Sequence, residues 1–332
     1  MNVRAQTPTQ VRSDAREGRG PWDLYDRLLD AIPAGPQVRE VVIGLTWTLC
    51  RSAGWGLAMS PGTPTRTLSW PGTLSGRPVR DLAAWVRSWD PYEATVGMAA
   101  INSVINDAAD LAASATPLFP TGPANLAVFE HFAPRLADKR VVVVGRYPKL
   151  ESLNLDWQLS ILERQPASGD LPDPAAEYLL PEADWVFLTA TSIPNKTFPR
   201  LAELSRDAQV VLMGPTVPWL EALADYGIDY LAGVDVVDGN RLSQTVAEGG
   251  GTRIFETGAR YRVAALNAGE TERLRTAMAH TTTCRAALAQ ALDDQQFNGA
   301  QSGSSTSAEL EAMDRLLSEL AARLGRAQET RG

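Results

Sequence analysis

The middle of the sequence alternates continuous apolar runs with segments typical of turns or helices. The runs occupy residues 140–145, 159–164, 184–189 and 209–214. A parallel strand that is buried on both faces has this continuous apolar character, and strands that alternate with helices predict a doubly wound α/β sheet. The shorter segments 229–233 and 253–255 are expected to add edge strands. In such a sheet, ligands bind outside the carboxyl ends of the strands.

The first part of the chain has a different pattern. The predicted elements are an amphipathic helix at 21–29, strands at 39–48 and 53–59, and helices at 80–89 and 93–113. Because the two strands are close in sequence, they are expected to pair as an antiparallel hairpin. This order predicts an α+β domain ahead of the parallel sheet.

Composition along the chain indicates how it divides. Prolines cluster between residues 114 and 138, which is typical of a connection between domains. The expected parts are a disordered tail at 1–20, an α+β domain at 21–120, a parallel-sheet domain at 121–266 and a helical extension at 267–332. The linker 298–307 separates an alanine-rich helix at 270–297 from a final helix. These features predict a C-terminal helical hairpin.

The final helix carries an apolar stripe. Its members are Leu310, Met313, Leu316, Leu317, Leu320 and Leu324. A stripe at this spacing packs against another surface, which is either the rest of the chain or a second copy. We favour a second copy and therefore expect a homo-oligomer.

Charge and composition exclude several classes of protein. The net charge is −8 and the pI is near 5.0, which argues against nucleic acid or an anionic membrane surface as a partner. No apolar run has the length of a membrane span, and the first residues lack the apolar core of a signal peptide. We therefore expect a cytoplasmic protein.

Metal-binding side chains are scarce. The chain has two cysteines and two histidines, with no spacing that predicts a disulfide framework or a structural zinc site. A directly bound metal would therefore need oxygen ligands. No metal-ligating residue is assigned from the sequence.

The first strand of the sheet ends at Gly145, but the GxGxxG phosphate loop is missing, since Arg146 and Tyr147 follow. Glu163 lies 18 residues further on, near the place where a dinucleotide fold has the acid that binds a ribose. The alternative is a solvated acid at a strand end. An adenosine-type ligand therefore stays open, as does a methyl donor, and no cofactor is assigned.

The segment 189–199, TATSIPNKTFP, contains one of only three lysines in the chain, Lys196. Lys196 is a solvated residue at a helix start, or it forms an anion pocket with free N–H groups of that helix. The second reading groups Thr191, Asn195 and Thr197 with it, and makes Lys196 the candidate catalytic residue. A third reading, N-glycosylation at Asn195, requires a secreted protein.

The turn Gly214-Pro215-Thr216 follows the fourth strand. Two prolines fix its backbone, so Thr216 is expected at the rim of the site with its hydroxyl available; the alternative is a turn without a ligand. Asn102 is unusual inside a helix. We expect Asn102 and Thr46 to face the sheet from the first domain.

Six stretches together resemble a known prokaryotic family. They are IGLTWTLCRSAGWGLAMSP (43–61), VGMAAINS (96–103), VVVVGRYP (141–148), ILERQPASGDLPDPAAEYLLPEADWVFLTATSIPNKTF (161–198), MGPTVPW (213–219) and LAGVDVVD (231–238). The family has no known function and is labelled "putative heavy-metal chelation". It combines an enolase-N-terminal-like domain with a Rossmann-like domain. The resemblance extends from about 22 to 266, and the family usually has Gly-Pro-Ser where this chain has Gly214-Pro215-Thr216.

The resemblance implies a role in metal homeostasis. With so few soft ligands, we interpret "chelation" as binding or processing of a small anionic or chelator-type molecule in the cleft between the two domains. The alternative is a non-catalytic carrier for a metal complex, assembled through its C-terminal helices. Whether the chain is an enzyme stays open.

Overall fold

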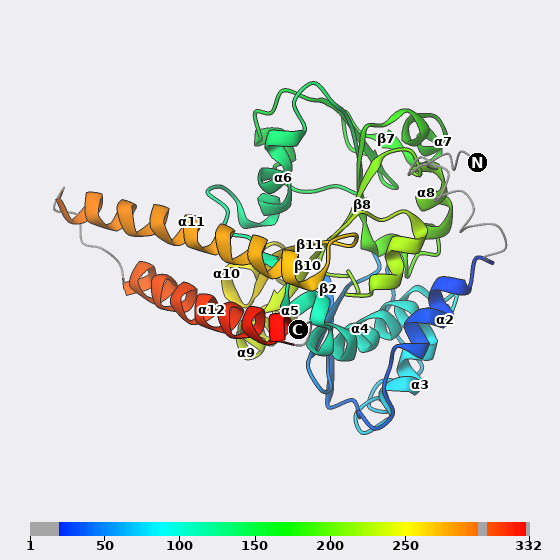
Figure 1. Ribbon diagram of the computed structural model, residues 1–332. Helices are drawn as coiled ribbons and strands as arrows, with labels where there is room; N and C mark the ends of the chain where they lie inside the picture. The colour runs from blue at the N-terminus through cyan, green and yellow to red at the C-terminus, as the bar shows by residue number, and fades with distance from the viewer. Residues whose placement is uncertain (1–19, 298–303, 330–332) are drawn as a thin grey trace, which may run out of the picture.

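The computed structural model describes residues 20–297 and 304–329. It is a mixed α/β structure in which a parallel-rich sheet carries helices on its faces, and a long helical hairpin projects to one side (Figure 1). Only residue 20 of the predicted tail at 1–20 is described. Of the predicted linker at 298–307, residues 298–303 lie outside the described residues, whereas residues 304–307 belong to the last helix and were wrongly assigned to the linker.

The N-terminal part contains a three-stranded antiparallel sheet. Its elements are α2 (Asp23–Asp30), β1 (Glu40–Ile43), β2 (Trp47–Arg51), β3 (Trp55–Met59), α3 (Val79–Ala83), the 3-10 helix η1 (Ala84–Arg87), α4 (Pro91–Ala108) and α5 (Asp110–Ala113). The strand predicted at 39–48 is in fact two strands, because the chain turns at 44–46. The helix predicted at 93–113 is broken at Ala109, whose ψ of 124° is extended.

The main sheet has eight strands in the order β4-β11-β10-β9-β8-β5-β6-β7. Their bounds are β4 (Thr116–Pro117), β5 (Arg140–Val144), β6 (Gln158–Glu163), β7 (Leu171–Pro172), β8 (Trp185–Thr189), β9 (Gln209–Met213), β10 (Tyr230–Val236) and β11 (Ala259–Ala265). The strands from β5 to β10 pair in parallel, whereas β11 and β4 are antiparallel additions at one edge. The chain winds outward from β5 to β7 and then returns to β8 on the other side of β5. The sheet therefore changes its winding direction between β5 and β8, which is a topological switch point.

Several short helices connect these strands. They are η2 (Ala124–Leu126), α6 (Ala127–Phe132), η3 (Ala133–Arg135), η4 (Leu150–Ser152), η5 (Asp173–Ala175), α7 (Ala176–Leu179), η6 (Leu180–Glu182), η7 (Ala190–Ser192), α8 (Phe198–Leu204), η8 (Glu221–Tyr226), α9 (Gly239–Ala247) and α10 (Ile254–Thr257). The edge strand predicted at 253–255 is wrong, since α10 occupies it. The strand predicted at 229–233 is β10, but it lies inside the sheet and not at its edge, because β11 pairs along its whole length and β4 pairs with β11.

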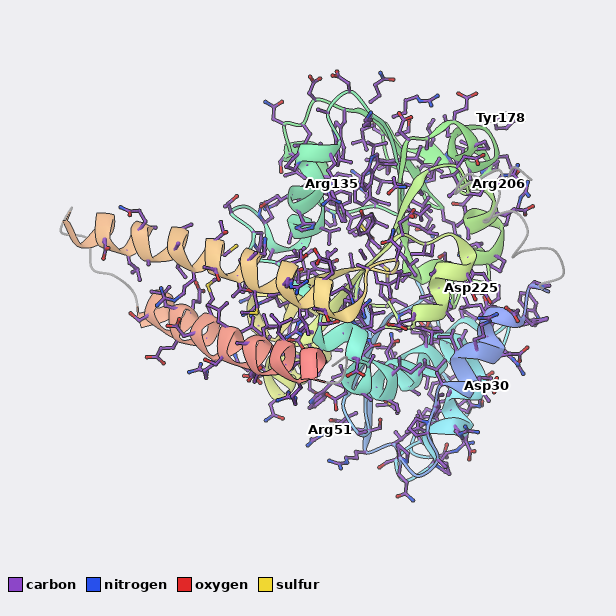
Figure 2. All side chains as sticks on the ribbon, in the orientation of Figure 1. Asp30, Arg51, Arg135, Tyr178, Arg206 and Asp225 are labelled. Atoms are coloured by element: carbon purple, nitrogen blue, oxygen red, sulfur yellow. The ribbon has the colours of Figure 1, made fainter. Side chains whose placement is uncertain are left out.

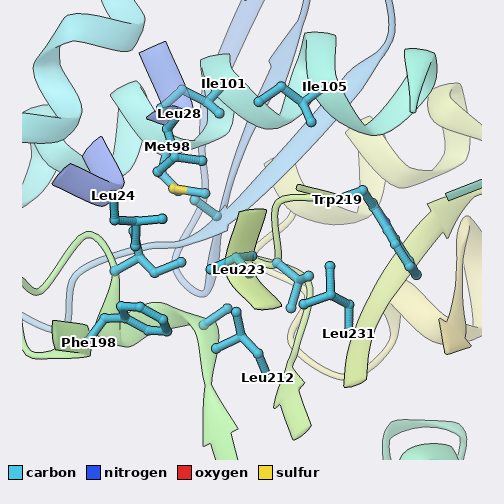
Figure 3. Packing of buried hydrophobic residues seen from close by; sticks show 14 of the residues in the cluster. Leu24, Leu28, Met98, Ile101, Ile105, Phe198, Leu212, Trp219, Leu223 and Leu231 are labelled. Carbon is cyan, nitrogen blue, oxygen red and sulfur yellow. The ribbon is translucent and has the colours of Figure 1, made fainter. Parts of the chain in front are cut away.

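One apolar core joins the N-terminal part to the sheet. Leu24 and Leu28 from α2, and Met98 and Ile101 from α4, belong to the same cluster as Phe198, Leu212, Leu223 and Leu231 (Figure 3). The opposite face of the sheet forms a second cluster, in which β2 and β3 contribute Trp47, Leu49 and Leu57. Because both clusters combine the two parts, burial of apolar surface holds them together.

The C-terminal extension confirms the predicted hairpin. Its helices are α11 (Glu270–Phe297) and α12 (Ser304–Glu329), which extend from the body at the left of Figure 1. Leu316, Leu320 and Leu324 of the predicted stripe pack against Leu274 and neighbours on α11. This part of the stripe is therefore covered by the chain itself. Assembly through the hairpin stays a prediction.

Candidate functional site

Two strands of the main sheet end in glycines on either side of β8. Gly145 follows β5 with a φ of 99°, and Gly214 follows β9 with a φ of 111°. Both angles lie in the left-handed region, which favours glycine because it has no Cβ. Space is also limited, since a Cβ at Gly145 would lie 3.2 Å from the Thr189 side chain. Gly145 is half-buried and Gly214 is buried, and the two strand ends at the switch point carry no side chain.

Hydroxyl groups surround these strand ends. The Tyr147 hydroxyl forms a hydrogen bond with Thr189, and burial raises the pKa of Tyr147, so the phenol is neutral. The Thr189 hydroxyl donates to the Thr191 hydroxyl at 3.2 Å. Thr191 in turn lies 3.6 Å from the Sδ of Met59, which comes from β3 and is 40% exposed. The result is an uncharged, hydrogen-bonding surface where the N-terminal part meets the sheet.

The sequence did not single out Tyr147, Thr189 or Met59 as site residues. Two of them carried a usable signal. Thr189 is the last residue of a predicted strand, and Tyr147 lies two residues beyond the glycine that ends another. Met59 carried no signal, because only the tertiary structure brings β3 to this edge.

The carboxylate of Glu163 binds backbone N–H groups at the same edge of the sheet. It accepts hydrogen bonds from the N–H groups of Arg146 at 2.9 Å, Arg164 at 2.8 Å and Gln165 at 3.3 Å. The Arg146 side chain is paired with Asp170. These bonds fix the turn after β5 against the end of β6, and the predicted ribose contact of Glu163 stays a prediction.

Asn102 and Thr216 meet across the two parts, as expected. The Asn102 amide on α4 donates to the carbonyl of Thr216 at 3.0 Å and to that of Leu57 at 2.8 Å. However, Thr216 is 1% exposed and its hydroxyl accepts the N–H of Met59 at 3.0 Å. The expectation that Thr216 stands at a rim is therefore wrong, because β3 covers the turn. Pro215 is buried beside it.

Asn106, one helical turn beyond Asn102, also links the two parts, and the sequence analysis did not single it out. Its amide donates to the Val217 carbonyl at 3.1 Å and accepts from the Trp219 N–H at 3.0 Å.

The Oδ1 atom of Asn102 is buried and has no hydrogen-bond partner among the described residues. One acceptor therefore stays available beside the Gly214-Pro215-Thr216 turn.

Lys196 contacts the N-terminal part rather than the strand ends. Its ammonium donates to the carbonyls of Ser88 and Pro194 and lies 5.8 Å from the centre of the Trp89 ring. Its backbone φ of 62° is left-handed. Close by, the Tyr25 hydroxyl donates to the Ile193 carbonyl at 2.8 Å. Residues 193–196 therefore anchor the sheet to α2 and to the segment before α4.

The backbone N–H groups around Lys196 are already hydrogen-bonded. Those of Asn195, Lys196 and Thr197 donate to the carbonyls of Thr191, Ile193 and Ser192. The next helix, α8, begins only at Phe198. Asn195 is exposed and Thr197 is half-buried, and the anion pocket stays a prediction.

Thr46 lies in the turn between β1 and β2. Its hydroxyl faces Gly251, and its carbonyl accepts from the N–H of Ser60 at 2.9 Å. An open cavity of about 720 Å³ lies beside this turn, lined by Ile43, Gly44, Leu45, Ser60, Pro61, Gly62, Thr63, Pro64, Thr65, Arg66, Thr67, Leu68, Pro71 and Tyr92. All of these residues belong to the N-terminal part, so this cavity is separate from the strand ends.

Burial lowers the pKa of Lys196 to about 8 from the ordinary value of 10.5. Because only a neutral amine reacts with an acylating reagent, the labelling rate of Lys196 is expected to be half-maximal near pH 8. Peptide mass spectrometry can follow each of the three lysines separately, with the exposed Lys139 and Lys149 as internal references. A Lys196 profile without an inflection near pH 8 would contradict this.

The same shift has a consequence for stability. The unfolded chain holds the Lys196 proton up to about pH 10.5, whereas the folded chain releases it near pH 8. The free energy of unfolding therefore rises with pH between about pH 8 and pH 10.5. The wild type should gain stability relative to Lys196→Met between pH 8 and 10.

Comparisons with known proteins place this arrangement in a family. Residues 127–265 match the DUF364 family and residues 25–105 match the DUF4213 family, both described as "putative heavy-metal chelation". A crystal structure of a DUF364 protein with unknown function from Desulfitobacterium hafniense has 37% sequence identity and a TM-score of 0.66. It matches over 74% of this chain and 99% of that chain. The chain belongs to the DUF364 family.

Two further proteins are similar to this chain. The structure of a DUF364 protein with unknown function from Pyrococcus horikoshii has 20% identity and a TM-score of 0.59, covers 73% of this chain and 98% of that one, and shows the same fold. An uncharacterized protein of Methanocaldococcus jannaschii is 28% identical over 158 residues, which are 46% of this chain and 58% of that protein. The chain therefore spans little more than half of this curated relative.

The DUF364 description raises the question of a metal. Among residues 20–297 and 304–329, no group of three or more His, Cys, Asp or Glu side chains is arranged to hold a metal ion. The strand ends offer hydroxyls and backbone groups, which are hard ligands and poor partners for a heavy metal, and the single soft thioether of Met59. In the same residues, no helix has the length and apolarity needed to cross a membrane.

Proposed function

We propose that this DUF364 protein binds or processes a small, chelator-type organic molecule at the carboxyl ends of β5, β8 and β9. In this proposal the chain acts in metal homeostasis through the organic ligand. Residues 21–120 would form the enolase-N-terminal-like domain and residues 121–266 the Rossmann-like domain. The order β7-β6-β5-β8-β9-β10 supports the second assignment, because it is the doubly wound order.

One observation carries the proposal. Gly145 and Gly214 end two strands without a side chain at the switch point, with Thr189 between them and the Tyr147 hydroxyl beside them. Doubly wound sheets bind their ligands at this place. Met59 would close the site from the N-terminal part.

The chemistry of the site suits a polar organic ligand. Tyr147, Thr189 and Thr191 offer hydroxyls, which both donate and accept hydrogen bonds. Asn102 adds a buried acceptor next to the Gly214-Pro215-Thr216 turn. Carboxylate and hydroxyl groups of a chelator match these partners. Lys196 would act indirectly, by holding the N-terminal part against the sheet.

The test begins with molecules that stay bound through purification, identified by mass spectrometry. A thermal-shift screen of carboxylate chelators, alone and as zinc complexes, follows. For a stabilising molecule, Tyr147→Phe should weaken binding by roughly 2- to 12-fold, which corresponds to one neutral hydrogen bond of about 0.5–1.5 kcal/mol. Product analysis then decides between an enzyme and a carrier.

Tyr178→Phe is the matched control, because Tyr178 is 78% exposed and lies on α7 (Figure 2). It should bind as the wild type does. If Tyr147→Phe and Thr191→Val both retain full affinity, the ligand does not bind at the strand ends.

A further inference from the structure

Three of the four histidine and cysteine residues of the chain come together between α6 and α11. His131 lies on α6, and His280 and Cys284 lie four residues apart on α11. In Figure 1 these two helices approach each other near the base of the hairpin. The family match ends at residue 265. The cluster therefore depends on a helix beyond the part shared with the family.

The distances within this cluster suit a shared metal ion. The Sγ of Cys284 lies 3.5 Å from the Nε2 of His280. A tetrahedral zinc ion with bonds of about 2.3 Å to sulfur and about 2.0 Å to nitrogen separates these two atoms by roughly 3.6 Å. The rings of His131 and His280 have centroids 5.8 Å apart, so both imidazoles can reach one ion.

The surroundings leave the cluster accessible. His131, His280 and Cys284 are all half-buried, so each of the three side chains keeps some contact with solvent.

Nearby positive charge affects the choice of ligands. Arg135 lies over the Phe132 ring, and Arg260 lies over Phe119, whose ring stacks on His280. Arg135 is labelled in Figure 2 on the side of the body that faces α11. A dication with neutral ligands alone would be disfavoured here, whereas a thiolate offsets one of its charges.

We propose that Cys284, His280 and His131 bind one zinc ion at the base of the helical hairpin. His131 has to turn its ring for this, because its ring now packs edge-on against His280 at 74° and the three groups do not yet form a site. Cys284 loses its proton to solvent on binding. The ion would link α11 to α6 and so fix the hairpin to the sheet, independently of the strand-end site.

Cobalt is the spectroscopic probe for this site. Tag-free, reduced full-length protein is titrated with Co²⁺, and we expect saturation at one ion per chain with a sulfur-to-cobalt charge-transfer band. Zn²⁺ should displace the cobalt. Cys284→Ser should abolish the band, and His280→Gln or His131→Gln should weaken binding by more than about 10-fold, the lower limit for second-shell changes.

Cys50→Ala is the matched control, because Cys50 is the other cysteine and is buried in the core of the N-terminal part. It should keep the band and the affinity. Circular dichroism confirms that each variant is folded. A band that survives in Cys284→Ser, a loss in Cys50→Ala, unchanged affinity in His131→Gln, or no saturation at one ion would each overturn the proposal.

The two proposals can fail separately. Cys284→Ser should leave binding of a chelator at the strand ends unchanged, and Tyr147→Phe should leave the cobalt band unchanged. If Cys284→Ser also loses the chelator, or Tyr147→Phe also loses cobalt, the zinc site is not independent of the strand-end site.

Discussion

Gly56→Ala is expected to lower the free energy of unfolding by roughly 3 kcal/mol or more. Gly56 lies in β3 where this strand crosses α4. A Cβ at this position would lie 2.2 Å from both the Ala99 carbonyl oxygen and the Ser103 amide nitrogen. Both atoms belong to the helix backbone, which cannot move without disturbing its hydrogen bonds. The methyl group therefore has to push β3 and α4 apart.

Chemical denaturation measures the effect, with Gly62→Ala as the control. A Cβ at Gly62 would meet no described atom within 4 Å, so this variant should stay within about 0.5 kcal/mol of the wild type. If Gly56→Ala is as stable as Gly62→Ala, the strand does not lie this close to the helix.

Asn102→Leu is expected to destabilise the protein by roughly 2–5 kcal/mol, because two carbonyl groups lose their donor. The Asn102 amide bonds the carbonyls of Leu57 and Thr216, and Asn102 itself is fully buried. An unsatisfied buried group costs about 1–3 kcal/mol. The bond to Thr216 spans 114 positions in the sequence, so its loss loosens the contact between the N-terminal part and the sheet.

Two measurements separate this effect from a general loss of packing. Asn240→Ala, at an exposed position of α9, should leave stability unchanged. Amide hydrogen exchange should accelerate at Met59, whose N–H bonds the Thr216 hydroxyl. Unchanged exchange at Met59 in Asn102→Leu would show that Asn102 does not hold this contact.

Local pattern was enough to predict the centre of the sheet. The apolar runs 140–145, 159–164, 184–189 and 209–214 correspond to β5, β6, β8 and β9, because a strand buried on both faces needs apolar residues at every position. The short strands β4 and β7 were missed. Each has only two residues, and such strands exist through their pairing with a neighbour.

Helix ends were less predictable. The alanine-rich segment 93–113 was predicted to be one helix, but the extended backbone of Ala109 divides it into α4 and α5. The helix that was expected to start at Lys196 begins only at Phe198, as α8 (Phe198–Leu204). Intrinsic helix propensity is a weak preference that tertiary contacts override. Around Lys196 the contacts with Ser88 and Trp89 set the backbone, and neither contact is visible in the local sequence.

The parallel strands and the glycines that follow two of them, Gly145 and Gly214, are encoded locally, because strand burial and a left-handed φ each restrict the residue type at a position. Which side chains meet depends on the folded arrangement of the whole chain. The Lys196 ammonium donates to the carbonyl of Ser88, which is 108 positions away in the sequence. The rings of His131 and His280 pack edge to face. Such contacts result from the packing of apolar faces that are far apart in the sequence, so residue spacing does not predict them.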